Sequence, residues 1–526
     1  STVWREAVGG APIQYHAVPL TLAGGVVAAT LLAMLAMWLA LRRQARRPAA
    51  VLLAEGGHES SSSSLSLSRS RRRGHWVAAI GAVAAVTMLI WAARSGEGQS
   101  AGLFFGAGAA LLVAGLGLSA ARLGVLAASE AAAKLTLTAM GIRSATRRRK
   151  RSLAILGLLA CGSFLIASIG VFKRDAVRGA EQRASGTGGF ALIGESTQPV
   201  VEDLNTASGR DHFGLDTNVL AGVDFVPLRV RDGDDASCLN LNRVQQPRLL
   251  GVRPELLAQR GAFTFARLAP GLPKADPWLL LRRRPGDPAV PAIGDQASIL
   301  WALGKRVGDT VDYTDERGRR FQLRLVGAVA NSILQGSLLI AEEEFLARFP
   351  TATGYRMFLI DAPSNSVARL SAELTRGMQD LGLQVTPAAA RLAAFNAVQN
   401  TYLGTFQALG GLGLVLGSVG LGAVVLRSVL ERRGELALLL AVGFRPQALK
   451  WLVLSEHVAL LAAGLGVGVV AALVAVLPAV LAPGTQLPYR SLAWTLAGVL
   501  VNGAVWTWLA TVGALRGNLV QALRND

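Results

Sequence analysis

The sequence predicts an α-helical polytopic membrane protein with a large α+β extracytoplasmic domain. Of its 526 residues, 52% are hydrophobic and 17% are charged, and the mean hydropathy is +0.41, which is more apolar than a soluble core requires. A helix rises about 1.5 Å per residue and the hydrocarbon core of a bilayer is about 30 Å thick. Stretches long and apolar enough to cross it lie near residues 18–41, 76–93, 102–126, 152–172, 403–426, 452–481 and 491–515.

The basic residues predict the orientation of these spans. The formal net charge is +19, but the arginines cluster beside the apolar runs, so the charge reports topology and we expect no nucleic-acid partner. Cytoplasmic loops carry an excess of lysine and arginine. Basic clusters follow the first, third and fifth spans, which predicts that these loops are cytoplasmic and that residues 174–400 lie outside the membrane.

Residues 174–400 form the one sizeable polar region and are predicted to fold as an extracytoplasmic α+β domain. Alternating apolar residues at 321–329 and 337–340 indicate strands, and helical patterns follow at 341–349 and 364–381. A further helical stretch from about residue 387 is expected to continue into the fifth span as a stalk. By contrast, residues 57–75 contain a run of serines and are predicted to be a flexible cytoplasmic linker.

A charged motif follows the fifth span. Residues 428–443 read S-V-L-E-R-R-G-E-L-A-L-L-L-A-V-G, Glu456 opens the sixth span, and residues 518–524 read N-L-V-Q-A-L-R. This pattern resembles the signature of the FtsX-like permease family, which includes MacB-like and LolC/LolE-type subunits. One span, a large external domain and three further spans is also the order of that family.

The resemblance implies a division of the chain into modules. Residues 134–173 would be the amphipathic basic helix and first span of an FtsX-type module, and residues 401–526 its three-span permease domain with a cytoplasmic coupling helix. Residues 1–56, which end in a P-x-x-x-L pattern at Pro48, resemble the tail of a preceding module. Residues 76–133 would be the connecting pair of spans of a ten-span member. Because the chain starts at Ser1 without methionine, we expect it to be the C-terminal part of a longer polypeptide.

The segment between the fifth and sixth spans is the main candidate site. Residues 431–442 predict a short helix with Leu436, Leu439 and Leu440 on one side and its charged residues toward water or a partner. From the residues alone, a solvated hairpin and a docking helix both remain open. The resemblance implies docking in a groove of an ATPase, through Glu431, Arg432, Arg433, Glu435, Leu439 and Gly443.

A second candidate site is the basic stretch before the fourth span. Apolar residues precede the basic ones there, which is typical of a helix lying on an anionic membrane surface. A topology signal is the alternative. The resemblance implies contact with the ATPase as well, and the residues concerned are Arg143, Arg147, Arg148, Arg149, Lys150 and Arg151.

Glycines crowd the fifth and sixth spans. Gly413 and Gly417 have the spacing of a small-xxx-small helix contact, and Gly464 and Gly468 repeat it in the sixth span. We expect these four glycines to serve helix packing. Glu456 and His457, at the inner edge of the sixth span, are expected to anchor the helix at the interface instead of relaying protons.

Several motifs of enzymes are missing from the sequence. No G-x-x-x-x-G-K-[ST] motif occurs, so ATP is expected to be bound and hydrolysed by a partner. His212 is the single histidine of residues 174–400, which argues against a zinc site or a catalytic triad there. The acidic run at 232–235 lacks the spacing of a calcium loop and predicts an exposed turn. We therefore expect no catalytic residues, no metal and no cofactor.

The resemblance implies a non-catalytic transmembrane subunit of an ABC transporter in the bacterial cytoplasmic (inner) membrane. Its work would be the export or extraction of a lipoprotein, lipid, peptide or drug, driven by a cytoplasmic ABC ATPase dimer. Membrane lipid, a second permease copy or paralogue and a periplasmic partner are the other partners that the resemblance allows. The alternatives are an FtsX-like regulator of a periplasmic cell-wall hydrolase and, from a different class, a membrane-anchored extracytoplasmic enzyme.

Overall fold

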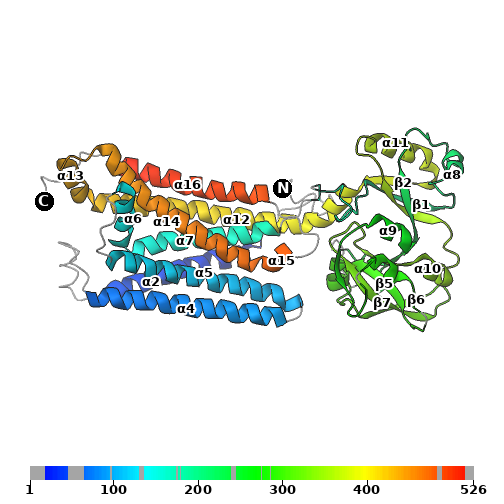
Figure 1. The fold of residues 1–526 in the computed structure, drawn as a ribbon, viewed down its shortest axis with the longest axis horizontal. Coiled ribbons are helices and arrows are strands. Elements are labelled where there is room, and N and C mark those ends of the chain that lie inside the picture. Colours follow the sequence, from blue (N-terminus) through cyan, green and yellow to red (C-terminus); the bar gives the residue numbers. More distant parts are fainter. Residues whose placement is uncertain are drawn as a thin grey trace.

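The computed structural model describes residues 18–45, 64–94, 97–128, 136–147, 149–172, 176–177, 179–237, 244–273, 275–284, 286–481 and 489–515. It consists of a bundle of long helices and a separate mixed domain, residues 179–387, which we call the head (Figure 1). We call the end of the bundle opposite the head, where α6 and α13 lie, the far end. The Pro48 ending, residues 57–63, Arg148 and the ending at 518–524 lie outside the described residues.

The described part of the bundle contains seven helices long and apolar enough to cross a membrane, at the seven places where the sequence predicts spans. The chain is therefore a multi-pass membrane protein. The helices are α2 (Pro19–Ala45), α4 (Ser64–Arg94), α5 (Glu97–Ala128), α7 (Arg149–Val171), α12 (Ala388–Glu431), α14 (Pro446–Ala475) and α16 (Tyr489–Leu515); the shorter ones are α6 (Leu137–Arg147), α13 (Arg433–Ala441) and α15 (Leu477–Leu481).

The linker predicted at residues 57–75 is wrong over its second half. Helix α4 begins at Ser64 and is continuous to Arg94, so residues 64–75 extend the span by about three turns. Arginine and leucine are good helix formers, and no proline or glycine interrupts residues 64–73. The polar residues 64–75 are therefore the part of α4 that extends beyond its apolar, membrane-spanning stretch.

The head is an α+β domain, as predicted. Its ten strands form one sheet in the order β10-β1-β9-β2-β3-β8-β5-β7-β4, with β6 paired to β7. Most neighbouring strands are antiparallel, while β3 with β8 and β5 with β7 are parallel. The strands are β1 (Leu192–Val200), β2 (Asp224–Arg231), β3 (Arg248–Val252), β4 (Phe265–Leu268), β5 (Val290–Asp295), β6 (Thr310–Thr314), β7 (Arg320–Val329), β8 (Ser337–Ala341), β9 (Tyr355–Asp361) and β10 (Gln384–Pro387).

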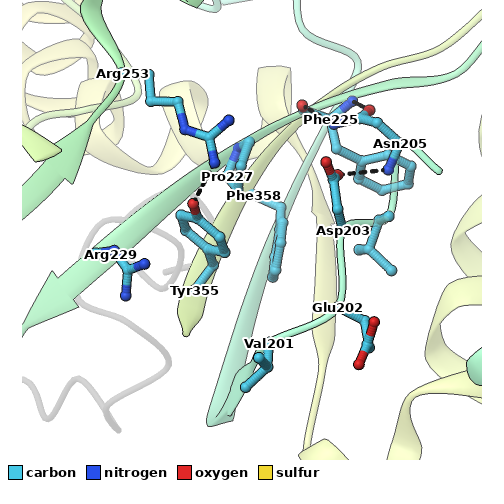
Figure 2. Close-up of a pocket in the computed structure, with 11 residues that line it drawn as sticks. Val201, Glu202, Asp203, Asn205, Phe225, Pro227, Arg229, Arg253, Tyr355 and Phe358 are labelled. Carbon is cyan, nitrogen blue, oxygen red and sulfur yellow. Dashed lines mark hydrogen bonds between the residues drawn. The ribbon is translucent and has the colours of Figure 1, made fainter. Parts of the chain in front are cut away.

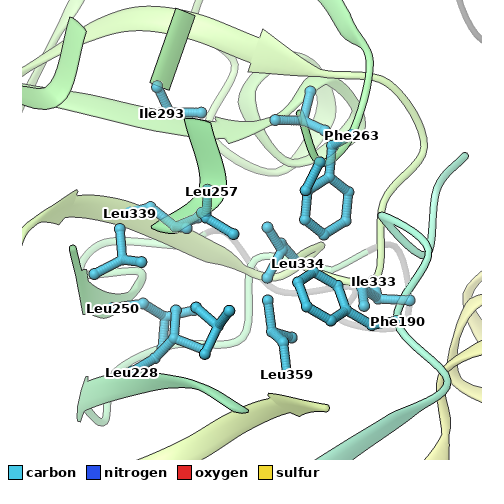
Figure 3. Close-up of a cluster of buried hydrophobic side chains, with 14 of the residues drawn as sticks. Phe190, Leu228, Leu250, Leu257, Phe263, Ile293, Ile333, Leu334, Leu339 and Leu359 are labelled. Carbon is cyan, nitrogen blue, oxygen red and sulfur yellow. The ribbon is translucent and has the colours of Figure 1, made fainter. Parts of the chain in front are cut away.

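Short helices cover this sheet and close its core. The predicted helices at 341–349 and 364–381 are α10 (Glu342–Arg348) and α11 (Val367–Gly377), the second followed by a 3-10 turn at Gln379–Leu381. The head also contains helices α8 (Ala207–His212) and α9 (Pro254–Arg260), a 3-10 helix at Pro277–Leu281 and a π-helical turn at Ser298–Ala302. Figure 3 shows the largest apolar cluster, in which Leu257 of α9 lies among side chains of the sheet such as Leu228, Leu250 and Leu359.

Helix α12 joins the head to the bundle. Its first turns belong to the head, because Ala388 and Leu392 are buried in the same apolar cluster as Phe190 and Ile333. The helix then runs without a break over 44 residues to Glu431, a length of about 66 Å at 1.5 Å per residue. The stalk predicted from residue 387 is therefore confirmed, and it is one helix with the fifth span (Figure 1).

Candidate coupling site at the far end of the bundle

Two turns of backbone set α13 apart from the helices on either side. Helix α12 ends at Glu431, Arg432 leaves the helical conformation with φ −105 and ψ 13, and α13 starts at the next residue. Gly443 has φ +105, a conformation that costs glycine little and other residues more. Proline at position 446 then opens α14. The chain thus presents a short helix between two spans (Figure 1).

Arg432 ties this turn to the bundle. Its Nη1 donates to Glu456 of α14 at 3.0 Å, and the two side chains are only 14% and 8% exposed. Its Nε also donates to Glu435 at 3.4 Å. The prediction that Arg432 faces water or a partner is therefore wrong. A guanidinium group that is this deeply buried needs a carboxylate partner. Glu456 supplies it, although the sequence predicted an interfacial anchor there.

Glu431, the residue before Arg432, makes a second ion pair, with a different span. Glu431 accepts a hydrogen bond from Arg151 at the start of α7 at 2.9 Å and one from Arg427 at 2.8 Å. The side chains of Glu431 and Arg151 are about one third exposed, so water screens this pair more than the buried one. Arg151, predicted to face lipid head groups, is instead paired with the coupling turn.

Helix α13 has one face on the bundle and one face open. Leu436 is buried, and Leu439 packs against the same apolar cluster, as the predicted apolar side requires. Leu439, which is predicted to dock, is thus partly covered by the bundle. The open face carries Glu435, whose side chain is 54% exposed, together with Leu438 at 59% and Val442 at 72%. These three residues are spaced i, i+3 and i+7, so they line one side of the helix. The side chain of Arg433 lies outside the described residues.

Helix α6 lies at the same end of the molecule and crosses α14. Gly141 makes the crossing close, because a Cβ there would lie 2.7 Å from the carbonyl oxygen of Leu452. Leu137 and Met140, one turn apart on one side of α6, remain more than one third exposed, which fits an apolar face toward lipid. Arg149 donates through Nε to the carbonyl of Thr146 at 3.3 Å. Arg143 is half-buried, and the side chains of Arg147 and Lys150 lie outside the described residues.

The four glycines predicted to pack helices divide into two groups. Gly464 and Gly468 of α14 face α7, and a Cβ at Gly468 would collide with Ser163 Oγ and the Ala160 carbonyl. Gly417 faces Leu158 of α7. Gly413 has no atom of the described chain within 4 Å of a Cβ built there, so its predicted contact is not made within this chain.

The acidic run of the head is bound up in local structure. Asp232 pairs with Arg356 at 2.7 Å. Asp234 accepts hydrogen bonds from the backbone of Gln245 and Gln246, and Asp235 accepts from Ser237. These carboxylates therefore close a turn, as predicted. No group of three or more metal-ligating side chains that could hold an ion occurs among the described residues.

A comparison with family models matches residues 408–519 to the FtsX-like permease C-terminal domain. The match begins within α12 and covers α13, α14 and all the described part of α16. It thus includes the turn at Arg432, the open face of α13 and Glu456. A comparison with curated proteins finds no match for the chain.

Proposed function

We propose that this chain, which belongs to the FtsX-like permease family and is the membrane permease of an ABC-type system, transmits ATP-driven motion from a separate cytoplasmic ATPase to its head. The supporting observation is the continuity of α12, which is buried in the head at Leu392 and ends at the tied turn of Glu431 and Arg432. A single helix of this length moves at both ends when it is displaced at one, because its backbone hydrogen bonds are internal.

The open face of α13 is the proposed docking surface for the ATPase. Glu435 gives it a charge, and Leu438 and Val442 give it apolar area outside the predicted hydrocarbon layer. Exposed leucine and valine beside a charged residue are typical of a surface that a partner covers. A push on this face reaches α14 through Arg432 and Glu456 and reaches α7 through Glu431 and Arg151.

The proposed orientation follows from the basic residues at the far end. Arg143, Arg427, Arg432 and Arg445 lie on or beside α6 and α13, and the positive-inside rule assigns that end to the cytoplasm. The head then stands outside the cytoplasmic membrane. Lipids with anionic head groups would surround α6.

The proposed work is mechanical and extracytoplasmic. A head driven from the cytoplasm suits export or extraction of a lipoprotein, lipid, peptide or drug, as MacB-like and LolC-type permeases do. In this proposal the chain has no catalytic residue and no cofactor of its own, and it acts with an ATPase dimer and a second permease copy or paralogue.

The docking proposal is tested with substitutions on the open face of α13. Leu438→Asp and Glu435→Arg are expected to weaken association with the partner ATPase by at least about tenfold, since each changes the contact by more than about 1.4 kcal/mol. Gln447→Asp, at an exposed position on α14, is the matched control. Wild-type association of both α13 variants, measured in detergent by surface immobilisation of the permease, would exclude this surface.

The orientation is tested by labelling from one side of the membrane. Glu435→Cys and Arg317→Cys, in a background with Cys161 and Cys238 replaced by serine, are expected to react with an impermeant maleimide from opposite faces of oriented vesicles. Reaction of both from one face would contradict the proposed path of force.

A further inference from the structure

A cavity of about 200 Å³ opens on the head, far from the coupling turn. Its walls come from four parts of the sequence: the loop 201–205 after β1, strand β2, strand β9, and Arg253 ahead of α9. Figure 2 shows Arg253 and Glu202 at opposite sides of this set, with Phe358 between them.

The floor of the cavity is apolar and rigid. Phe225 and Phe358 are buried, and Pro227 lies directly opposite Phe358 in the antiparallel register of β2 and β9. The side chain of Asn205 holds the loop in place, because it donates to the carbonyl of Phe225 at 2.9 Å and accepts from the same residue's N–H at 2.8 Å. The cavity is therefore preformed.

One wall carries a surplus of positive charge. Arg229 and Arg253 share a single carboxylate, Glu342, at 2.7 and 2.9 Å, and Tyr355 donates to it at 2.9 Å. Two guanidinium groups and one carboxylate leave a formal charge of +1. Arg253 is held in place by Tyr355 at 2.6 Å, yet its side chain is 50% exposed, and its Nη1 makes no hydrogen bond within the described part of the chain. It is thus oriented for an anionic group.

The opposite wall is acidic. Glu202 is exposed, and Asp203 is oriented by the N–H of Asn205 at 2.9 Å. Val201, 71% exposed, lines the cavity on the same side as Glu202. An occupant that satisfies both walls therefore has an apolar body, an acidic group on one side and a basic group on the other.

The size of the cavity decides the class of occupant. Sites for whole drug-sized molecules measure about 300–1,000 Å³, and this cavity is smaller. It has room for one large side chain. A peptide supplies such a side chain together with flanking acidic and basic residues. A lipid acyl chain is too long for this cavity and carries no charged groups.

We propose that this cavity is a docking site for an extended peptide segment of a protein partner, which places one aromatic or large aliphatic side chain on Phe358, an acidic group on Arg253 and a basic group at Glu202. This site lies in the head alone. It is independent of the ATPase, so its test and the test of the proposed function fail separately.

The first experiment measures binding of small probes to the full chain in nanodiscs by ligand-observed NMR. N-acetylphenylalanine is expected to bind saturably, its carboxamide about tenfold more weakly, and N-acetylalanine not measurably. The factor of ten corresponds to about 1.4 kcal/mol, the low end for a hydrogen bond to a charged group. Equal binding of acid and amide, or no saturable binding, would overturn the proposal.

Two substitutions locate the site. Arg253→Gln is expected to abolish the preference for the acid over the amide. Because Arg253→Gln also removes a partner of Glu342, Val201→Asp is the second variant. Val201 is an exposed lining residue, and its replacement by a carboxylate is expected to repel the acid and weaken its binding at least threefold. Arg317→Gln, an exposed arginine elsewhere in the head, is the control. Wild-type binding by both test variants would refute the site.

A further pair of probes separates a peptide from a small carboxylic acid. Ac-Lys-Phe-Asp-NH2 is expected to bind several-fold more tightly than Ac-Gln-Phe-Asp-NH2, and Glu202→Gln is expected to remove that difference. If lysine brings no gain in the wild-type chain, the occupant is a small aromatic acid and the peptide proposal is wrong.

Discussion

The two ends of α12 are held by different forces. At the head, Ala388 and Leu392 are 0% and 4% exposed within an apolar core. At the far end, Glu431 and Arg432 are held by ion pairs to α7 and α14. Apolar burial is non-directional, and its many contacts are lost together. An ion pair is a single contact with a defined geometry, and either group can pair with another. In the proposed mechanism, the head end of α12 is therefore the fixed joint and the far end is the joint that moves.

The largest effect is expected from breaking the helix between the two joints. Gln399→Pro removes a backbone hydrogen bond in the interior of α12 and costs the helix about 3 kcal/mol or more. We expect this variant to bind the ATPase at α13 but to lose ATP-dependent work in the head. Gln399→Ala, at the same exposed position, is the control. Full ATP-dependent work by Gln399→Pro would show that α12 is not the path.

The far joint is tested next by removing one member of its buried ion pair. Arg432→Met leaves Glu456 buried without its cation, and such losses cost about 3–5 kcal/mol. Thermal unfolding of the reconstituted chain is expected to show this destabilisation. The double variant Arg432→Met with Glu456→Gln is expected to recover most of it. An equal loss in both would mean that the arginine contributes packing instead of charge.

A smaller effect separates the glycines of the two helices. Gly468→Val introduces atoms against the backbone of α7 and is expected to cost about 1–3 kcal/mol. In Gly413→Ala the new Cβ has no neighbour within 4 Å in the described chain. This variant is expected to be neutral or stabilising by up to about 1 kcal/mol. Denaturation of both variants in one detergent measures the difference. A severe defect in Gly413→Ala confined to the assembled complex would reveal a contact with another chain.

The smallest effect concerns pH and the head alone. Burial by itself would raise the pKa of Glu342, but hydrogen bonds from Arg229, Arg253 and Tyr355 outweigh it and hold this pKa below its usual 4.5. Because the folded-state pKa of Glu342 is lowered, this carboxylate stabilises the head at pH values above 4.5. That contribution is lost as the pH falls through the folded-state pKa. In Glu342→Gln, the stability of the head is therefore expected to fall less steeply as the pH drops below 4.5. An unchanged acid profile in that variant would assign the loss to other carboxyls.

The sequence was sufficient for the spans and for the place of the coupling helix. Hydropathy locates the seven helices, and Gly443 with Pro446 marks the end of α13. It was insufficient for the ties, because Arg151 and Glu431 are 280 residues apart and pair only once α7 lies beside α12. The sequence also did not show that Leu438 is exposed, since neighbouring residues differ by about 100° around a helix and the facing bundle decides which side is open.

The head shows the same limit. Alternating residues predicted β7 and β8, yet the order β10-β1-β9-β2 depends on contacts between residues nearly two hundred positions apart. The cavity on the head draws Glu202, Pro227, Arg253 and Phe358 from four separate segments. No local pattern joins such residues, so the cavity could not be predicted from the sequence.

The most direct test of force transmission is hydrogen–deuterium exchange of the head in the reconstituted permease–ATPase complex, with and without a non-hydrolysable ATP analogue. The proposed mechanism predicts that the analogue changes protection at α13 and in the strands of the head that contact the start of α12, and that Gln399→Pro retains the change at α13 and loses the one in the head. Identical responses of the head in Gln399→Pro and Gln399→Ala would contradict it.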